Sequence, residues 1–268
     1  MKKTIKIAIS GALGKMGTSL IKESKNFKNI KLNLLILKKI NKKNQKKLKK
    51  LIKIKKNNIL IEDNIKKNKN FDILIDFTNP KNTMKNLKFC YNNNKKIIIG
   101  TTGLTEKHYI DMKKKSKKIS ILYSSNFSVG INLLLKLLEI TTKNIGLESD
   151  IEISESHHRY KIDSPSGTAL TLGKKIAKTL KKDFNNISNF EKNTKKYKRK
   201  KNEIGFNVIR AGEIIGNHSI LFINKEEKIE IKHQAFSRKT FSKGAIKAAI
   251  WINNKKNGLF TMENVLKK

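Results

Sequence analysis

Near its start the chain reads Ile5-Lys6-Ile7-Ala8-Ile9-Ser10-Gly11-Ala12-Leu13-Gly14-Lys15-Met16-Gly17. The apolar residues from 5 to 9 are typical of a short buried strand, and residues 18–25 predict the start of a helix. Glycines between a strand and a helix permit a tight turn and a close approach of the backbone to a ligand. The helix N-terminus offers N–H groups to a pyrophosphate. The motif therefore predicts a dinucleotide-binding unit, and a packing turn without a ligand is the alternative.

The alternation of strands and helices continues after this motif as far as residue 128. Such an order predicts an α/β fold with an N-terminal, Rossmann-type, doubly wound parallel sheet. The expected strands are 30–37, 71–77, 97–99 and 119–123, and the expected helices are about 81–92, a Lys-rich segment before residue 119 and part of the polar connection 42–56.

The pattern changes after Val129, where an apolar helix leads into segments that read as hairpins. This order predicts a second, α+β domain with a mixed, largely antiparallel sheet. The expected domains are 1–128, to which 238–268 returns, and 129–237, with 183–202 as a mobile insertion. The expected elements of the second domain are helices at 131–140 and 167–180, a strand at 150–154, and hairpins over 204–236 with turns near 211–213 and 224–226.

The net charge of +40 suggests a nucleic acid or an anionic membrane as a partner. Only four of the 61 basic residues are Arg, however, and aromatic residues make up 7% of the chain. Dedicated nucleic-acid binders use Arg forks and stacked aromatic rings, whereas abundant Lys, Asn and Ile reflect A/T-rich codons. We therefore expect no specific nucleic-acid partner, and we interpret the Lys runs 42–56, 113–118 and 192–201 as solvated surface.

The single Cys90 excludes an intramolecular disulfide framework and indicates a reducing cytoplasm. No apolar run approaches the roughly 20 residues that a membrane-spanning helix needs, so no membrane association is expected.

The residues after the second expected strand bear on the choice of cofactor. An NAD site usually has an acidic residue about 20 residues past the glycines, where it binds the ribose 2′-hydroxyl. Here that position is Leu37, and Lys38 and Lys39 follow it. Two cations suit a 2′-phosphate better than a hydroxyl, so the sequence predicts a preference for NADPH, with NADH possible. The alternative is that both lysines belong to the general Lys background of the chain.

Small polar residues follow three further expected strands of the first domain. Open α/β sheets bind ligands at the carboxyl ends of their strands, where small side chains let a nicotinamide ring approach the backbone. These residues are Thr78, Gly100-Thr101-Thr102 and Ser124-Ser125-Asn126.

Chemistry-bearing residues concentrate in the segment 155–168, which reads Glu-Ser-His-His-Arg-Tyr-Lys-Ile-Asp-Ser-Pro-Ser-Gly-Thr. His157, His158, Arg159 and Lys161 form a cationic cluster that suits a dicarboxylate. The residues Ser166-Gly167-Thr168 open a helix whose hydroxyl and N–H groups could hold a carboxylate. A surface loop with a capping turn is the alternative.

At these residues the sequence resembles the 4-hydroxy-tetrahydrodipicolinate reductase family. The resemblance rests first on the segment from Glu155 to Ala169 and extends, in the same order, over nearly the whole chain. Its other segments are 11–17, Ile75-Asp76-Phe77-Thr78-x-Pro80, 100–103, Asn126-Phe127-Ser128-Val129-Gly130, Val208-Ile209-Arg210-Ala211-Gly212 and Ser237-Arg238-x-Thr240-Phe241.

The resemblance implies reduction of 4-hydroxy-tetrahydrodipicolinate to tetrahydrodipicolinate by hydride transfer from NAD(P)H, in lysine and diaminopimelate biosynthesis. It implies that His157 acts as the acid/base residue and Lys161 as the proton donor, and that His158, Ser166, Gly167 and Thr168 contact the substrate. It also implies a homotetramer formed through the second domain, and no metal is expected. The implied cofactor contacts are Gly11, Ala12, Leu13, Gly14, Lys15, Met16, Gly100, Thr101, Thr102, Ser124, Ser125, Asn126 and Phe127.

Three other functions remain open from the sequence alone. One is a different Rossmann-fold dehydrogenase with a thiol nucleophile, for which Cys90 is the only candidate. The second is a binder of nucleic acid or another anionic surface, supported by net charge alone. The third is a catalytically decayed, anion-binding protein that keeps the fold, which the intact His157 and Lys161 argue against.

Overall fold

The structure is a computed structural model that describes residues 4–52, 59–190 and 198–267. It divides into two compact units, of which the first runs to Val129 and resumes at Arg238, and the second is Gly130–Ser237. Parts of the expected polar connection 42–56, of the expected mobile insertion 183–202 and of the Lys run 192–201 lie outside the described residues.

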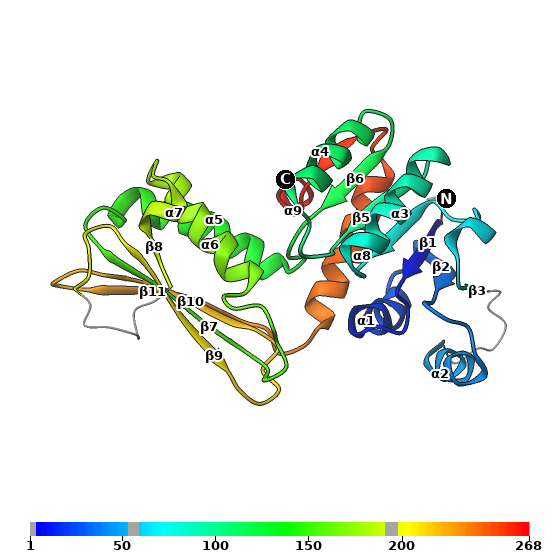
Figure 1. The fold of residues 1–268 in the computed structure, drawn as a ribbon, viewed down its shortest axis with the longest axis horizontal. Coiled ribbons are helices and arrows are strands. Elements are labelled where there is room, and N and C mark those ends of the chain that lie inside the picture. The colour runs from blue at the N-terminus through cyan, green and yellow to red at the C-terminus, as the bar shows by residue number, and fades with distance from the viewer. Residues whose placement is uncertain (1–3, 53–58, 191–197, 268) are drawn as a thin grey trace. The chain divides into compact units, whose positions relative to one another are not determined.

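The first unit is built on a parallel sheet with strand order β12-β6-β5-β4-β1-β2-β3 in the described part of the chain (Figure 1). β1 lies between β2 and β4, with Ile7 in register with Leu32 and Ile73. The doubly wound parallel sheet expected from the sequence is therefore confirmed. Its strands are β1 (Ile5–Ser10), β2 (Ile30–Ile36), β3 (Leu60–Glu62), β4 (Ile73–Asp76), β5 (Lys96–Ile99), β6 (Ser120–Tyr123) and β12 (Gly258–Phe260).

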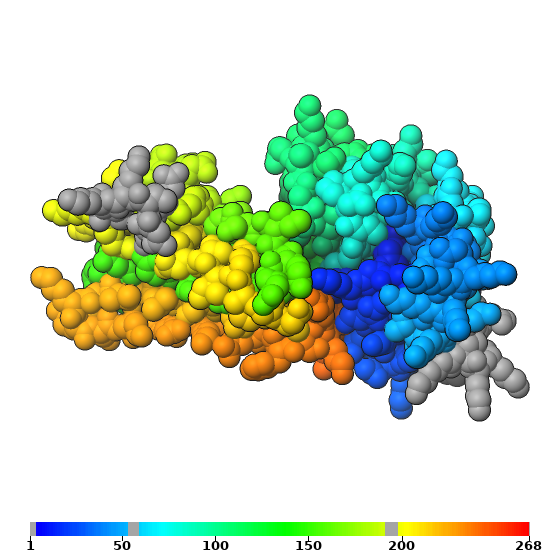
Figure 2. Space-filling model, turned by 60° about the horizontal axis from the view of Figure 1, so that its bottom comes forward, coloured from blue at the N-terminus to red at the C-terminus, as the bar shows by residue number. Residues whose placement is uncertain are grey.

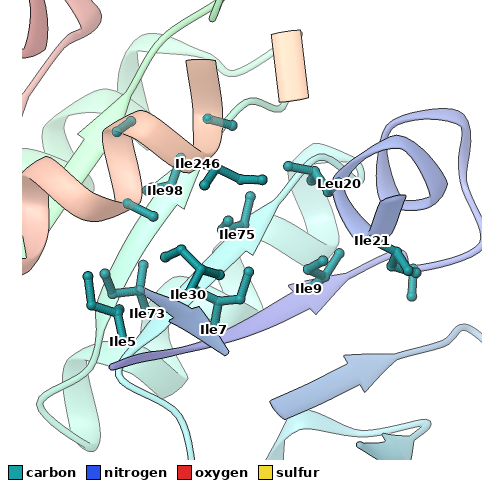
Figure 3. Packing of buried hydrophobic residues seen from close by; sticks show 14 of the residues in the cluster. Ile5, Ile7, Ile9, Leu20, Ile21, Ile30, Ile73, Ile75, Ile98 and Ile246 are labelled. Atoms are coloured by element: carbon teal, nitrogen blue, oxygen red, sulfur yellow. The ribbon is translucent and has the colours of Figure 1, made fainter. Parts of the chain in front are cut away.

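Helices cover both faces of this sheet because its strands are apolar on both sides. On one face, Leu20 of α1 and Ile246 of α8 pack over the inward isoleucines of β1, β4 and β5 (Figure 3). On the other face, Leu87 of α3 and Met112 of α4 close a second core. The helices of this unit are α1 (Lys15–Ser24), α2 (Lys42–Ile52), a 3₁₀ turn η1 (Ile65–Lys67), α3 (Pro80–Asn92), α4 (Glu106–Lys115), α8 (Lys239–Asn253) and α9 (Met262–Leu266).

The second unit has a mixed sheet of order β11-β10-β7-β9-β8, with helices α5 and α6 packed on one face. Ile151 and Ile153 of β7 point into this core, while the alternate residues of the strand point away from it. Its elements are α5 (Val129–Ile145), β7 (Asp150–His157), α6 (Gly167–Thr179), α7 (Phe184–Ile187), β8 (Ser188–Asn189), β9 (Ile204–Arg210), β10 (Asn217–Ile223) and β11 (Lys228–Gln234).

Strand pairing in this sheet corrects one expectation from the sequence. β9 and β10 do not form a hairpin, because β7 lies between them, parallel to β9 and antiparallel to β10. β10 and β11 do form the expected hairpin, closed by the bond from Asn224 N–H to the carbonyl of Glu227. Among the described residues, parallel and antiparallel pairings are therefore equally represented in this mixed sheet.

Lysine side chains lie mainly at the surface of the described structure. On α2 most lysines are exposed, while Leu48 and Ile52 face the core. Long side chains accordingly project from the blue segment of the chain in the space-filling view (Figure 2). Over the described ranges, none of the helices combines the length and the apolar character needed to cross a lipid bilayer.

Candidate active site

Four loops of the first unit meet at the carboxyl edge of its parallel sheet. They follow β1, β4, β5 and β6, which bring together the small residues singled out in the sequence. A Cβ atom built on Gly11 would lie 2.8 Å from Cγ2 of Thr78, and the backbone N–H of Thr78 donates to Oγ1 of Thr101 at 3.2 Å. This edge is where open α/β sheets bind ligands.

The glycine turn after β1 has a geometry that side chains would block. Gly11 has φ +71°, in the left-handed region, and its N–H donates to the carbonyl of Ile36 at 3.0 Å. A Cβ atom on Gly17 would lie 2.3 Å from the carbonyl oxygen of Gly11. Gly14 is the N-cap of α1 and has no side chain to cap the helix, so the amide groups of the first turn are open to a phosphate.

The loops after β4, β5 and β6 are held by close packing. A Cβ atom on Gly100 would lie 2.1 Å from the ring of Phe77, which packs on Phe127 with ring centroids 5.2 Å apart. Phe127 is buried, so only its backbone is available at this edge. The Ser124 hydroxyl donates to the carbonyl of Asn126 at 2.7 Å, which fixes the loop after β6.

Asp76, at the end of β4, holds the following loop in place through hydrogen bonds. The buried carboxylate accepts hydrogen bonds from the Thr78 backbone and hydroxyl and from the side-chain amide of Asn86. Burial raises the pKa of Asp76, and these hydrogen bonds oppose that effect. The Asp76 network thus ties the end of β4 to α3.

Two cavities of 470 and 320 Å³ lie beside the glycine turn, and both are lined by Gly11 and by Lys38, which follows β2. Leu37 is only 4% exposed and packs in the core, although it also borders both cavities, so an apolar side chain stands where a ribose-binding carboxylate is usual. The sequence offered no carboxylate close to Leu37, but Asp63, just after β3, lines the same cavity as Lys38. Asp63 is paired with Lys67 at 2.8 Å, and this hydrogen bond is the main reason that its pKa is lowered.

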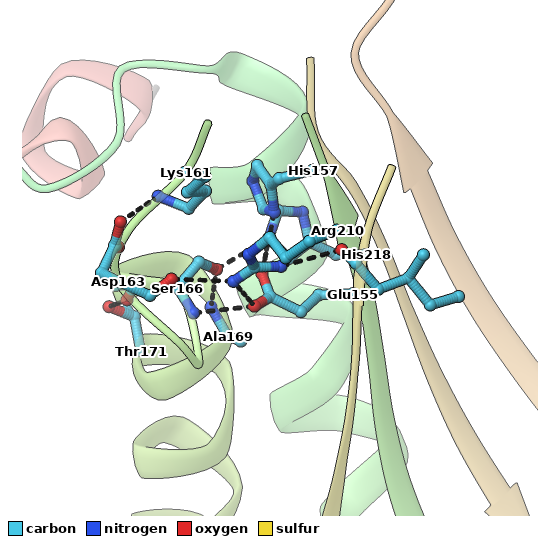
Figure 4. A network of polar contacts seen from close by, with 11 residues as sticks. Glu155, His157, Lys161, Asp163, Ser166, Ala169, Thr171, Arg210 and His218 are labelled. Atoms are coloured by element: carbon cyan, nitrogen blue, oxygen red, sulfur yellow. Dashed lines mark hydrogen bonds and ion pairs between the residues drawn. The ribbon is translucent and has the colours of Figure 1, made fainter. Parts of the chain in front are cut away.

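In the second unit, the polar residues of segment 155–168 gather around Glu155 (Figure 4). Glu155 is 1% exposed, and its Oε1 accepts from the Ser166 backbone N–H and from Nη2 of Arg210, both at 2.8 Å. Its Oε2 lies 3.0 Å from Nδ1 of His157 and 3.7 Å from Nε2 of His218. Burial alone would raise the pKa of Glu155, but the close contact with His157 and the hydrogen bonds from Ser166 and Arg210 hold it well below its usual range.

His218 lies beside His157, with ring centroids 5.1 Å apart in an edge-to-face arrangement. Burial, and next the proximity of His157, lower the pKa of His218 to about 3. The ring is therefore neutral near pH 7, and its Nε2 lies 3.3 Å from the Ser166 hydroxyl.

Lys161 and Asp163 lie in the loop just before the N-terminus of α6. Nζ of Lys161 is 2.6 Å from Oδ1 of Asp163. Ser166 is the N-cap of α6, and its buried hydroxyl accepts from the N–H of Ala169 at 3.2 Å, so this hydroxyl is engaged within the protein. A Cβ atom on Gly167 would meet nothing within 4 Å, so there is open space beside the first turn of the helix.

The structure brings together most, but not all, of the predicted cluster. Arg159 is exposed, and the guanidinium that enters the cluster belongs to Arg210 instead. Sequence reasoning missed Glu155, Arg210 and His218 as a connected set because β7, β9 and β10 bring them together from distant segments. The available signal was that Glu155 and Arg210 fall within the segments 155–169 and 208–212 that carry the family resemblance, whereas His218 falls in none of these segments.

The grouping of Glu155, His157 and His218 also has the donor types of a metal site, with ligand atoms within 4.8 Å of one another. The Arg210 guanidinium contacts the same carboxylate and adds a positive charge there, which opposes a divalent cation. We therefore interpret this grouping as a cluster of close charge contacts that hydrogen bonds from Ser166 and Arg210 hold in place.

Cys90 lies on α3 and is fully buried in the second core of the first unit. Burial raises the pKa of this thiol strongly, which leaves it as an inert thiol. A mechanism with a thiol nucleophile is therefore not supported.

A dinucleotide-binding sheet joined to a second unit with acid–base side chains is the architecture of many nicotinamide-dependent oxidoreductases, and this chain has that architecture. Two family models narrow the class: "Dihydrodipicolinate reductase, N-terminus" matches residues 5–127, and "Dihydrodipicolinate reductase, C-terminus" matches residues 130–266. The chain belongs to the dihydrodipicolinate reductase family, as its motifs predicted.

Individual relatives agree with this placement. A protein named 4-hydroxy-tetrahydrodipicolinate reductase from Buchnera aphidicola subsp. Baizongia pistaciae is 53% identical over 99% of this chain and 98% of its own length. One of the same name from Buchnera aphidicola subsp. Acyrthosiphon pisum (strain APS) is 44% identical over 99% of both chains. The dipicolinate-bound dihydrodipicolinate reductase from Paenisporosarcina sp. TG-14 shares the fold, with TM-score 0.77, 23% identity, and coverage of 98% of this chain and 100% of that one.

Proposed function

We propose that this protein reduces 4-hydroxy-tetrahydrodipicolinate to tetrahydrodipicolinate, with loss of water and transfer of a hydride from NAD(P)H. The observation that carries the proposal is that His157, Lys161 and the N-terminus of α6 lie together. The chain is also 53% identical to a protein named 4-hydroxy-tetrahydrodipicolinate reductase. The two substrate carboxylates, the ring nitrogen that gains a proton and the hydride donor each need a partner in the protein.

We assign the carboxylates to the opening of α6. Lys161 supplies a cation, and the first-turn amides at Gly167 and Thr168 supply N–H donors and the positive end of the helix dipole. His158 borders the same loop, where the N–H of Lys161 donates to its carbonyl at 3.1 Å. We propose that Ser166 contributes mainly by capping the helix, since its hydroxyl is already engaged with Ala169 and His218.

We assign proton transfer to His157 and Lys161. His157 is 8% exposed and is held by Glu155, which suits a side chain that must keep one orientation through the reaction. Lys161 lies just before the N-terminus of α6 with its side chain 20% exposed, and we propose that it donates a proton to the substrate ring.

The fit of a nicotinamide dinucleotide can be tested on the first unit alone. Bulk at Gly11, Gly17 or Gly100 would collide with Thr78, with the Gly11 carbonyl or with Phe77. These glycines are thus required by the close packing of the turns themselves. The α1 amides from Lys15 onward, which no side chain caps, suit the pyrophosphate of the cofactor. When bound, the cofactor supplies the hydride. We propose that Ala12 to Met16, the loop Gly100 to Thr102 and the loop Ser124 to Phe127 contact it.

We propose NADPH as the preferred cofactor and NADH as a possible one. Lys38 and Lys39 border the cavities beside Gly11, and Lys81 and Lys85 of α3 line one of them. Asp63 is the carboxylate in this cavity, and its partner Lys67 offsets its charge. The surplus of cations favours a 2′-phosphate over a hydroxyl.

We further propose a homotetramer in a reducing cytoplasm. The face of the second sheet opposite α5 and α6 exposes apolar residues, including Ile209 (50% exposed) and Ile223 (36% exposed), that a partner sheet could cover. The buried, free Cys90 is typical of a reducing compartment. Light scattering after gel filtration tests the tetramer, and a monomeric mass at micromolar concentration would reject it.

The reaction is tested by mixing the purified protein with freshly formed product of the upstream synthase and following the absorbance of NADPH, with NADH in parallel. We expect oxidation that depends on this substrate and is faster with NADPH. Oxidation of neither cofactor by folded protein would contradict the proposal, and a faster reaction with NADH would contradict the cofactor assignment alone.

A further inference from the structure

We propose that Glu155 is a positioning residue that fixes neutral His157 in one tautomer, with its proton on Nδ1 and a free lone pair on Nε2. The inference rests on the proposed function for its catalytic consequence, but the tautomer itself can be observed without any reaction. Glu155, His157, Arg210 and His218 come from three adjacent strands and converge in one buried cluster (Figure 4).

The carboxylate of Glu155 dictates which nitrogen of His157 carries the proton. Nδ1 of His157 lies 3.0 Å from Oε2 of Glu155. An ionised carboxylate favours a protonated nitrogen beside it and disfavours a lone pair. At this separation the proton of His157 therefore belongs on Nδ1, although the contact lacks the alignment of a full hydrogen bond. The hydrogen bonds to Glu155 hold the pKa of its carboxyl group below the usual range. The carboxylate therefore stays ionised near neutral pH.

The second nitrogen of His157 faces a position that has no side chain. A Cβ atom built on Gly216 would lie 3.0 Å from Nε2 of His157 and 3.4 Å from its Cδ2. Because Gly216 has no side chain, the Nε2 edge of the His157 ring is not crowded by this residue. A ligand at this edge could exchange a proton with Nε2. The neighbouring His218 is kept neutral by burial, so it places no second positive charge beside His157.

The other oxygen of Glu155 makes a sharp test possible. Oε1 accepts from two donors, the Ser166 backbone N–H and Nη2 of Arg210. In a Glu155→Gln variant, these two donors require the amide oxygen at the Oε1 position, so the NH₂ group takes the Oε2 position and faces His157. Nδ1 then faces an N–H group, which favours a lone pair on Nδ1 and therefore the proton on Nε2.

The prediction is therefore that Glu155→Gln reverses the tautomer of neutral His157. ¹⁵N NMR of protein labelled only in its five histidines, at about pH 9 where histidines are ordinarily neutral, distinguishes the two forms. We expect Nδ1–H in the wild type and Nε2–H in the Gln variant. In Glu155→Ala neither tautomer is imposed, and we expect a mixture.

Turnover should follow the tautomer. With the proton already on Nε2, neutral His157 cannot accept one from a ligand, so kcat should fall by at least about tenfold in Glu155→Gln while KM for the substrate changes by less than about threefold. The matched control is Glu152→Gln on the same strand, because Glu152 is paired with Arg199 on the other face of the sheet. This control should keep the wild-type tautomer and kcat.

The possible outcomes distinguish a failure of the proposed tautomer of His157 from a failure of the proposed reaction. An Nε2–H tautomer in the wild type would overturn the inference even if the Gln variant failed to fold. An unchanged tautomer in a folded Gln variant would overturn it as well. The expected tautomers in a protein that reduces no substrate would support the positioning role and reject the reaction.

Discussion

Nζ of Lys161 lies 2.6 Å from Oδ1 of Asp163, two residues further along the chain. Burial alone would raise the pKa of Asp163, but hydrogen bonds from Lys161 and from the Gly167 backbone hold it below its usual range. Asp163 thus places a carboxylate between a cation and a helix N-terminus, which is the arrangement proposed for a substrate carboxylate. The internal carboxylate and the substrate should compete for the same partners.

Replacing Asp163 should reveal this competition. In Asp163→Asn the competing charge is removed, so KM for the substrate should fall by about two- to fivefold, the range expected for one partly exposed ion pair. Steady-state kinetics at fixed NADPH measures the effect. Asp183→Asn is the control, because Asp183 is the N-cap of α7 and Asn caps equally well. A higher KM in Asp163→Asn would mean that Asp163 orders the site and does not compete for it.

Removing the Lys161 amine should affect turnover far more than cofactor binding. We expect kcat of Lys161→Ala to fall by roughly 10²- to 10⁴-fold, the usual contribution of a positioned proton donor. The Kd for NADPH, measured by fluorescence titration, should stay within about twofold. Lys175→Ala, which removes a lysine paired with Glu139 further along α6, is the control. Near-normal kcat in Lys161→Ala would reject its role as donor.

The cofactor preference should respond to Lys38, whose side chain is exposed at the cavity. In Lys38→Glu the ratio of kcat/KM for NADPH over NADH should fall by about tenfold, since a charge-assisted contact to the 2′-phosphate is lost. Lys31→Glu, at the opposite end of β2, should leave the ratio unchanged. An unchanged ratio in Lys38→Glu would show that this lysine belongs to the general surface charge.

Leu37 is not the residue with which to change this preference. A Leu37→Glu substitution, which the sequence alone would recommend, places a charge at a position that is 4% exposed in the core. Burying an unpaired carboxylate should lower the free energy of unfolding by several kcal/mol, at the upper end of single-residue effects.

The stability of the protein should fall as the pH is lowered from about 6.5. The pKa of His218 is about 3 in the folded state against 6.5 for the unfolded chain, so between these values the unfolded state binds more protons. The free energy of unfolding then decreases by up to about 1.4 kcal/mol per pH unit lost. His233, whose pKa burial also lowers, acts in the same direction. The stabilisation from Glu155, whose folded pKa is depressed, is lost only below about pH 4.5.

Urea unfolding at pH 7 and pH 5 in high salt, which screens the net charge, measures this dependence. His218→Gln should lose less stability than the wild type over this interval. Equal losses in the wild type and in His218→Gln would show that His218 is not the group responsible.

The sequence predicted the positions of helices and strands better than it predicted which strands pair with each other. Short apolar runs such as Ile73–Ile75 and Ile97–Ile99, bounded by turn residues in an alternating order of elements, predicted buried strands of a parallel sheet, and this is confirmed. Short strands such as β12 carry too few residues for a pattern, and they were missed. The supposed β9–β10 hairpin was wrong because alternation identifies a strand without identifying its neighbour, and β7 lies between the two.

The candidate site shows the same limit. Local motifs identified His157, Lys161 and the start of α6, since these residues lie within one short segment. They could not show that Arg210 and His218 complete the cluster or that Arg159 stays outside it, because these depend on strand register. The burial of Leu37 and the approach of Asp63 were likewise outside what a local pattern can reveal.

The central claim is hydride transfer from a nicotinamide to the product of the upstream synthase. The most direct measurement uses NADPH carrying deuterium at both C4 positions and determines the mass of the product formed by the wild-type protein. We expect one deuterium per molecule of tetrahydrodipicolinate, in step with NADPH oxidation. Oxidation without deuterium in the product, or a product that forms equally fast without the protein, would contradict the account.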